Sequence, residues 1–373
     1  MDILPPEILI HIFNKFEKLD DLRSCYNTCT KWKQIIEEYM QVKIFVATGC
    51  PTWQVEIINV LDPGFKLQLT DRNEYSIHRW SAVGGLVQNQ PVICGGTRFR
   101  FDWNCFEELK EVSILGQPNR TFEMFDIRLL SSSVALLNNS KLWITGGTSV
   151  RHPISKGQQK STELISIDQP PIKGPDLPFV ISNHTMVQID SKTVYIIGGM
   201  QNGKVSNKTW IVDPTNDFQI KEGPSLNEAR QRHSSAKMKI KGKLYIIVAG
   251  GMDYGARYPV PPGIKKSVEL LDTTSPDQFW EMGPDLPVRI YSAAMVTSPT
   301  KRGVILIGGR IVSSGSTVCH TWNKIIHLQM TRKTFLKSVL KWSYLPQKLQ
   351  HIRGYHLAFP ISTKVFKELK IKL

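Results

Sequence analysis

The chain has 373 residues, of which 47 are Lys or Arg and 32 are Asp or Glu, so its formal net charge is +15. Hydrophobic residues make up 41% and charged residues 21%, which is typical of a globular protein and excludes collagen-like and low-complexity classes. No apolar run approaches the roughly 20 residues that a membrane-spanning helix needs, so we expect no membrane association.

The first residues and the cysteines indicate an intracellular compartment. Asp2 and Glu7 stand where a signal peptide would carry basic residues, and no small-residue cleavage site follows them. The 6 cysteines form no C-x-x-C pair and are sparse for this length, which favours reduced thiols. We therefore expect a cytoplasmic and/or nuclear protein.

Residues 1–41 form the first predicted unit, a small all-α domain. Apolar residues recur there at helical spacing, and Pro5 followed by Glu7 suits the first turn of a helix. We expect a second helix to begin after the acidic pair Asp20–Asp21 and to bend or break before Lys31. A segment this short rarely buries enough surface to fold alone, so part of its apolar surface should face something else.

This segment resembles an F-box in the stretches LPPEILIHIFNKF and LDDLRSCYNTCTKWKQII. The resemblance implies that the helices dock on a Skp-family adaptor and, through it, on a cullin. The alternative is an N-terminal helical hairpin that packs only on the rest of the chain. The residues that we expect to contact the adaptor are Leu4, Pro5, Ile8, Leu9, Ile12, Phe13, Leu22, Cys29 and Trp32.

The remainder of the chain is repetitive. Diglycines that follow short apolar runs end at Gly96, Gly147, Gly199, Gly251 and Gly309, and a degenerate copy ends at Gly49. A spacing of about 50 residues is the period of a kelch repeat, in which each repeat is one four-stranded blade of a propeller. A strand with a polar start precedes each diglycine, and two further strands and a Gly-Pro corner follow most of them.

The repeats resemble kelch proteins, and the whole chain therefore resembles an F-box/kelch protein. We predict a mainly β fold, in which a six-bladed kelch β-propeller over residues 42–361 follows the small all-α F-box domain. The segment from Arg353 to Ser362 matches a first strand, whereas the first repeat starts at its second strand. We expect these ends to pair and close the ring. Residues 362–373 are predicted to form a basic tail, with a further strand as the alternative.

No enzyme motif is found. The sequence has no P-loop, no G-x-G-x-x-G after a strand, no H-E-x-x-H and no G-x-S-x-G. The 9 histidines are scattered and none pairs with cysteines or carboxylates at metal spacing. We expect no catalytic residues, no metal and no cofactor.

Arginines gather where a kelch propeller binds its ligands. In that family, one rim is built by the loops after the diglycines and by the entries to the first strands. A ring of guanidinium groups there would favour carboxylates or phosphates, so the substrate is predicted to be an acidic or phosphorylated protein. The alternatives are solvated arginines and salt bridges between blades. The predicted rim residues are Arg79, Arg98, Arg151, Arg232, Arg257, Arg289, Tyr291, Arg310 and Arg353.

Basic charge is also concentrated in residues 324–373, which hold Glu368 as their one acidic residue. No aromatic-interleaved platform accompanies these charges, so a nucleic-acid partner is not expected. The leading interpretation is a substrate-recognition adaptor of a Skp–cullin–F-box ubiquitin ligase. The alternative is a kelch scaffold of the cytoskeleton or of a nuclear assembly. Residues 38–43 leave almost no linker, so we expect a stiff connection between the two parts.

Overall fold

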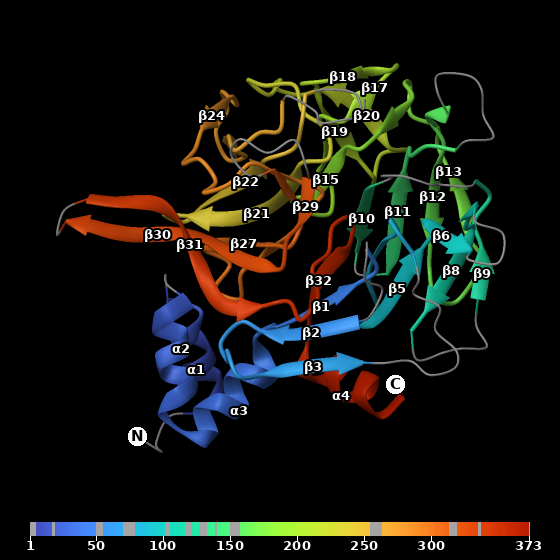
Figure 1. Cartoon of the computed structure of the whole chain (residues 1–373). Helices are drawn as coiled ribbons and strands as arrows, with labels where there is room; N and C mark the ends of the chain where they lie inside the picture. The colour runs from blue at the N-terminus through green and yellow to red at the C-terminus, as the bar shows by residue number, and fades with distance from the viewer. Residues whose placement is uncertain are drawn as a thin grey trace.

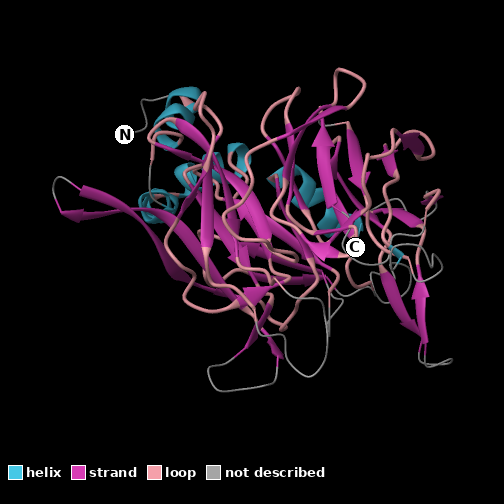
Figure 2. Ribbon diagram, turned by 90° about the horizontal axis from the view of Figure 1, so that it is seen from above, coloured by secondary structure: helices cyan, strands magenta, loops and turns pink. Residues whose placement is uncertain are grey.

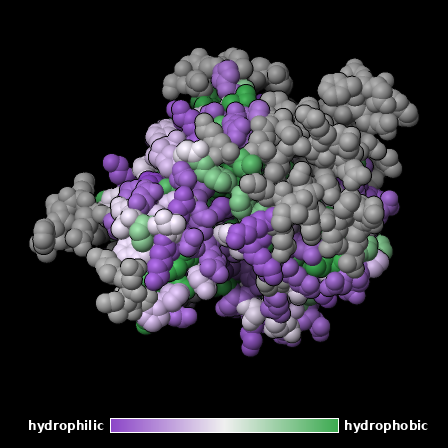
Figure 3. Space-filling model, turned by 90° about the horizontal axis from the view of Figure 1, so that it is seen from below, coloured by the Kyte–Doolittle hydropathy of each residue, from purple (hydrophilic) through white to green (hydrophobic). Residues whose placement is uncertain are grey.

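The structure is a computed structural model that is mostly β. It describes residues 5–16, 19–49, 55–69, 79–100, 105–115, 121–126, 133–138, 140–149, 157–253, 263–312, 319–334 and 337–372. Helices lie at the two ends of the chain, beside the sheets (Figures 1 and 2). In the described residues, no helix is long and apolar enough to cross a membrane. The described residues on the face seen in Figure 3 are mainly hydrophilic, with hydrophobic side chains in small groups between them.

Three helices open the chain: α1 (Pro6–Phe13), α2 (Leu19–Thr28) and α3 (Thr30–Tyr39). Proline stands at the start of α1 with Glu7 in its first turn, where a missing N–H costs nothing and a carboxylate meets the positive end of the helix dipole. The break between α2 and α3 falls at Cys29, whose backbone is extended. This break confirms the interruption predicted before Lys31.

Among the described residues, six four-stranded antiparallel sheets follow, here numbered in order around the molecule. Sheet 1 is formed by β1 (Lys43–Ala47), β2 (Val55–Asn59), β3 (Lys66–Leu69) and β32 (Leu357–Ile361), sheet 2 by β4 (Val83–Val87), β5 (Gln90–Cys94), β8 (Glu111–Ile114) and β9 (Thr121–Glu123), and sheet 3 by β10 (Ser133–Leu137), β11 (Lys141–Thr145), β12 (Thr162–Ile165) and β13 (Ile172–Gly174). Sheet 4 is formed by β15 (Thr185–Gln188), β16 (Val194–Ile197), β19 (Thr209–Asp213) and β20 (Gln219–Glu222), sheet 5 by β21 (Ser234–Ile240), β22 (Lys243–Ala249), β23 (Val268–Asp272) and β24 (Trp280–Met282), and sheet 6 by β26 (Ala294–Thr297), β27 (Gly303–Ile307), β30 (Lys324–Thr334) and β31 (Lys337–Lys348).

Among the described residues, three smaller sheets accompany the six four-stranded ones. They consist of β6 (Thr97–Arg100) with β7 (Cys105–Glu108), of β14 (Ile181–Ser182) with β17 (Met200–Gln201) and β18 (Lys204–Val205), and of β25 (Ile290–Tyr291) with β28 (Arg310–Val312) and β29 (Cys319–Thr321). The last of these carries several side chains of the site described below.

The six sheets surround a common centre in chain order (Figure 1). The innermost strand of each sheet contacts the innermost strand of the next, in the order β32, β4, β10, β15, β21, β26 and back to β32. The second strands, such as β16 and β27, are buried along their whole length, because neighbouring sheets cover both of their faces.

The last strand completes the first sheet. Strand β32 pairs antiparallel with β1, with Lys43 opposite Ile361 and Ala47 opposite Leu357. The rings of Phe45 and Phe359 stack across this pair with centroids 4.9 Å apart. The pairing between the first and last strands that the sequence predicts is therefore present, and β1 is paired on both of its edges.

The diglycines occur where the backbone must turn against the adjoining sheet. Gly251 has a φ of +89°, and a Cβ atom there would lie 2.7 Å from the carbonyl oxygen of Gln231. The N–H of Gly251 donates to the carbonyl of Ile290, 2.8 Å away, on the segment that leads into sheet 6. Glycine is needed here because no side chain fits and because φ is positive.

The prediction of a basic tail over residues 362–373 is wrong, and so is the alternative of a further strand. Residues Thr363–Lys372 form helix α4. Val365 is buried in the same core cluster as Phe45 and Phe359, and the ring of Phe366 lies 5.8 Å from that of Phe65. Val365 and Phe366, two apolar residues in a mainly basic segment, therefore pack α4 against sheet 1.

The N-terminal helices pack against sheets 1 and 6. Leu9, Phe13 and Leu22 share one core cluster with Ile58 of sheet 1 and Leu345 of sheet 6. The backbone N–H of Leu19 donates to the side chain of Gln329 on β30, 3.1 Å away. The helices therefore form a continuous core with the sheets.

Replacing Phe359 with alanine tests the contact that closes the ring. Phe359 is 8% exposed and joins β32 to β1, so we expect Phe359→Ala to lower the free energy of unfolding by about 3–5 kcal/mol. Phe279→Ala is the control, because Phe279 is 61% exposed and should change stability by no more than about 0.5 kcal/mol. Urea denaturation measures both, and equal costs would show that the stacked pair does not hold the ends together.

Candidate functional site

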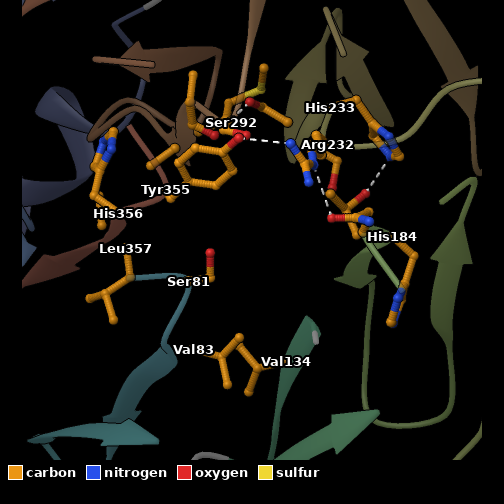
Figure 4. Close-up of a pocket in the computed structure, with 18 of the residues that line it drawn as sticks. Ser81, Val83, Val134, His184, Arg232, His233, Ser292, Tyr355, His356 and Leu357 are labelled. Carbon is orange, nitrogen blue, oxygen red and sulfur yellow. Dashed lines mark hydrogen bonds between the residues drawn. The ribbon is translucent and has the colours of Figure 1, made fainter. Parts of the chain in front are cut away.

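A cavity of about 250 Å³ lies at the centre of the six sheets. The inner strands β4, β10, β15, β21, β26 and β32 all contribute side chains to its wall (Figure 4). The lining comes from the beginnings of these strands, so the cavity opens at the end where they start. We call that end the front mouth and the opposite end, where the inner strands finish, the rear mouth.

A chain of backbone hydrogen bonds runs around the front mouth. The N–H of Arg232 donates to the carbonyl of Asn183 (2.9 Å), that of Ser292 to Arg232 (2.8 Å), that of Tyr355 to Ser292 (3.1 Å) and that of Ser81 to Tyr355 (3.0 Å). All five residues have φ between +51° and +57°, a conformation rarely adopted outside glycine. The entrance to each of these inner strands is therefore held in one strained turn.

Two arginines and two tyrosines gather at this mouth. Arg232 donates a hydrogen bond to the hydroxyl of Tyr355 (2.7 Å), and its guanidinium lies 5.3 Å from the centre of the Tyr355 ring. The guanidinium of Arg310 lies 5.8 Å from the ring centre of Tyr291 and 5.9 Å from that of Tyr355. The two rings meet edge to face at 6.4 Å. We call these four residues the mouth cluster.

The mouth cluster is positively charged. In the part of the chain that the structure describes, no carboxylate forms an ion pair with Arg232 or Arg310. Burial, reinforced by the neighbouring Tyr355, raises the pKa of Tyr291, so its hydroxyl stays neutral. Of these four residues, Arg232 and Tyr355 line the cavity, whereas Arg310 lies beside the Tyr355 ring and Tyr291 is buried.

Buried histidines line the channel behind the mouth cluster. His184 is 2.7 Å from the hydroxyl of Thr145, and His233 is 2.8 Å from that of Thr185. Burial, together with the charge of Arg230, lowers the pKa of His233 well below its usual value. Burial likewise lowers the pKa of His356 to about 3. His233 and His356 are therefore uncharged at neutral pH.

Two of the predicted rim arginines, Arg79 and Arg353, are buried and form ion pairs inside the fold, so their assignment to the rim is wrong. We call an arginine of this kind a buried strut. Arg79 is 2% exposed and pairs with Glu111 at 2.6 Å. Arg353 is fully buried and pairs with Glu56 of β2. The sequence left salt bridges between blades open as an alternative, but each of these pairs joins the entry of an inner strand to another strand of the same sheet.

A third arginine at an entry to an inner strand, Arg230, has the same role. Its guanidinium is 2.7 Å from Glu269 of β23, and both side chains are fully buried. Glu269 also accepts the backbone N–H groups of Asn227 (2.7 Å) and Glu228 (3.2 Å). The pair thus fixes the segment that enters sheet 5.

The other predicted rim residues fall into three groups. Arg232, Tyr291 and Arg310 come together in the mouth cluster. Arg289 is exposed and donates to the carbonyl of Ile264 (2.7 Å). The remaining predicted residues lie outside the described residues, in their side chains or entirely: Arg98, Arg151 and Arg257.

The expected rim set omitted Tyr355, although it is the centre of the mouth cluster. A signal existed in the two stretches R-Q-R-H from Arg230 and R-G-Y-H from Arg353. The first residue of each is a buried strut, and the third residue, Arg232 or Tyr355, lies on the front mouth. Comparing these two stretches would have separated struts from mouth residues.

The predicted adaptor-binding residues divide into an exposed and a buried group. Ile8 and Ile12, one turn apart on α1, are 47% and 38% exposed. Pro5 and Cys29 are also exposed, and Trp32 is half-buried. The remaining predicted residues are Leu9, Phe13 and Leu22, which are buried, and Leu4, which lies outside the described residues. One apolar face of α1 is therefore used inside the chain and the other is open.

A polar network fixes the helices to sheet 1 and to α4. Tyr26 donates to Glu37 (2.5 Å) and accepts from Asn59 of β2 (3.0 Å). The ammonium of Lys43 on β1 is 3.1 Å from Glu37, and the hydroxyl of Thr363 donates to the carbonyl of Glu37. Although burial acts to raise the pKa of Glu37, the contacts with Tyr26 and Lys43 hold it below its usual value.

The helices lie at the rear end of the channel. Helix α3 ends at Tyr39, close to the start of β1 at Lys43, and Lys43 is paired with Ile361 at the end of β32. A groove beside the rear mouth is lined by Tyr39 together with Lys239 and Lys301. The open face of α1 and the mouth cluster therefore belong to opposite ends of the molecule. In the described residues, no group of His, Cys, Asp or Glu could hold a metal ion.

Comparison with known proteins agrees with both parts. Residues 1–41 match the F-box-like family. No curated protein matches the chain significantly. Among solved structures, the chain is similar to that of YjhT, a kelch-type propeller, with a TM-score of 0.59 and 11% sequence identity over 80% of this chain and 94% of YjhT. The identity is low, so the likeness concerns the fold: an F-box-like domain precedes a mostly β body similar to a propeller.

Removing one member of the Arg230–Glu269 pair tests its structural role. Because the other charge would be left buried and unpaired, we expect Arg230→Met to lower the free energy of unfolding by about 3–5 kcal/mol. Arg289→Met removes an exposed guanidinium and should cost about 0.5 kcal/mol or less. Chemical denaturation measures the free energy of unfolding of both variants. Similar losses in the two would contradict a structural role for the Arg230–Glu269 pair.

The buried histidines predict loss of stability in acid. The folded pKa of His356, about 3, lies below the unfolded value of about 6.5. Its neutral form therefore stabilises the fold fully above pH about 6.5, and this contribution is lost as the pH falls toward 3. The free energy of unfolding should drop by about 1.4 kcal/mol per pH unit for each such histidine. Denaturation from pH about 6 to 4 should show a shallower slope for His356→Gln, whereas an unchanged slope would refute this account.

Proposed function

We propose that this chain is a non-catalytic substrate receptor of a Skp–cullin–F-box ubiquitin ligase. In this proposal the N-terminal helices dock on a Skp-family adaptor and, through it, on a cullin. The six sheets act as the blades of a kelch-type propeller that holds a target protein for ubiquitination. The site of action would be the cytoplasm and/or the nucleus.

The exposed face of α1 carries the proposal. Ile8 and Ile12 are open to solvent although Leu9 and Phe13, on the same short helix, are buried. This helix is apolar on two faces, and the rest of the chain covers one of them. An apolar face that stays exposed is typical of a protein interface. The match of residues 1–41 to the F-box-like family supports a Skp-family adaptor as the partner of this face.

The placement of the two ends suits a receptor. The F-box-like helices share a core with sheets 1 and 6 and are fixed by the Glu37 network, so the two parts should move as one body. A target held at the front mouth would then stay at a set distance from the ligase. Such a receptor contributes proximity, which raises the effective concentration of the target near the conjugating enzyme.

A kelch scaffold without a ligase role is the second candidate. The extensive burial of Leu9, Phe13 and Leu22 favours it, because helices that serve only to pack against the sheets would be buried in this way. The two candidates differ in the use of the open face of α1.

Charged substitutions on that face separate the two candidates. Burying one isoleucine is worth about 1.5–3 kcal/mol, so Ile8→Asp with Ile12→Asp should weaken binding to a purified Skp-family adaptor by about a hundredfold or more. Phe279→Asp, which changes an exposed aromatic residue near sheet 5, should bind like the wild type. Calorimetry measures the affinities, and an adaptor that binds neither protein or both equally would favour the scaffold.

A further inference from the structure

We propose that the mouth cluster binds one anionic side chain, a carboxylate or a phosphate, of a polypeptide that lies across the front mouth. This inference rests on the proposed function, in which that polypeptide is the target protein. It replaces a broad ring of arginines with a defined pair, Arg232 and Arg310, set around Tyr355.

The pair has unused binding capacity. Arg232 donates one hydrogen bond to the hydroxyl of Tyr355 (2.7 Å) and one to the side-chain oxygen of Asn183 (3.3 Å). A guanidinium carries five N–H donors, so others remain. The side chain of Arg310 is half-buried and forms no ion pair in the described part of the chain. Both groups approach one tyrosine ring from positions 5.3 and 5.9 Å from its centre. Guanidinium groups that are held in place and not neutralised favour carboxylate and phosphate oxygens.

The contrast with the buried struts supports this assignment. Arg79, Arg230 and Arg353 each have a glutamate partner inside the fold. Arg232 and Arg310 instead stack on aromatic rings, which holds a cation without cancelling its charge. The fold therefore neutralises the arginines that it buries and gives these two no carboxylate partner in the described residues.

The size and lining of the channel limit what can enter. Its volume of about 250 Å³ corresponds to roughly eight water molecules at liquid density, which suits a side chain and excludes a folded segment. Ser81, Ser292 and Ser235 contribute hydroxyl groups, and His233 is neutral. No acidic residue is among the described residues that line it, so an incoming anion meets no repelling charge from them.

Short peptide libraries provide the test. Each library has random flanking positions and one fixed central residue, which is Glu, phosphoserine, Gln or Lys, and the purified full chain is incubated with them without any adaptor. We expect the wild type to retain the Glu or phosphoserine library over the Gln library, and this preference should shrink as salt is added. Comparison of those two libraries tells a carboxylate ligand from a phosphate ligand.

The decisive variant is R232Q/R310Q, and K239Q/K301Q is its matched control. The control removes the same charge from two exposed lysines at the rear mouth. We expect R232Q/R310Q to lose the anion preference by about tenfold or more and the control to keep it. An equal loss in both variants would indicate unspecific charge attraction and overturn the proposal. A wild type with no preference would overturn it too.

Adaptor binding by the same proteins separates this inference from the proposed function. R232Q/R310Q should bind the Skp-family adaptor as the wild type does, because Ile8 and Ile12 lie at the other end of the molecule. Thermal melting of each variant shows whether the fold is kept. If R232Q/R310Q is unfolded, R232Q alone, which removes the guanidinium that lines the cavity, replaces it. An unchanged anion preference in a folded R232Q protein would then count against the site.

Discussion

The pairing of β32 with β1 is the contact on which the rest of the structure depends. It joins the two ends of the sheet region, and it brings the last inner strand against both β26 and β4. The channel exists because this contact makes the inner strands continuous around the centre. The same pairing places Tyr355 beside Arg232, which is 123 residues away in the sequence. The mouth cluster is thus a consequence of closure and cannot form in an open array of sheets.

Closure also fixes the N-terminal helices. Helix α3 leads almost directly into β1, and β32 leads directly into α4, so both helices emerge at the same edge of sheet 1. Glu37 is contacted there by Lys43 of β1 and by Thr363 at the start of α4. The buried ammonium of Lys43 further lies 5.0 Å from the ring centre of Phe366. Helix α4, which the basic composition led us to predict as a tail, therefore helps to hold the F-box-like domain against the sheets.

The sequence was sufficient to predict the repeat and the helical start, because both are written in regular spacing. Diglycines mark the second strands, and the pairing of β32 with β1 followed from one missing and one surplus strand. The fate of individual arginines was not predictable in this way. Arg353 and Arg232 are both arginines at an entry to an inner strand, yet one is buried and one is not. Their difference depends on a glutamate that is remote in sequence, as Glu56 is from Arg353. Likewise, helical spacing gave the apolar residues of α1 but not which face the sheets would cover.

The two roles of arginine follow from an offset of two residues. In the stretch from Arg230 to Arg232, the first side chain turns into the fold toward Glu269 and the second lies on the channel mouth. The strained turn at Arg232, with a φ of +54°, is held by its backbone bonds to Asn183 and Ser292. Strain of this kind persists only where the surroundings determine it, and here the buried pair and the ring of backbone bonds do so. Rigid struts inside the sheets are thus the reason that the side chains at the mouth are presented in a defined geometry, which is what recognition of a single anionic group requires.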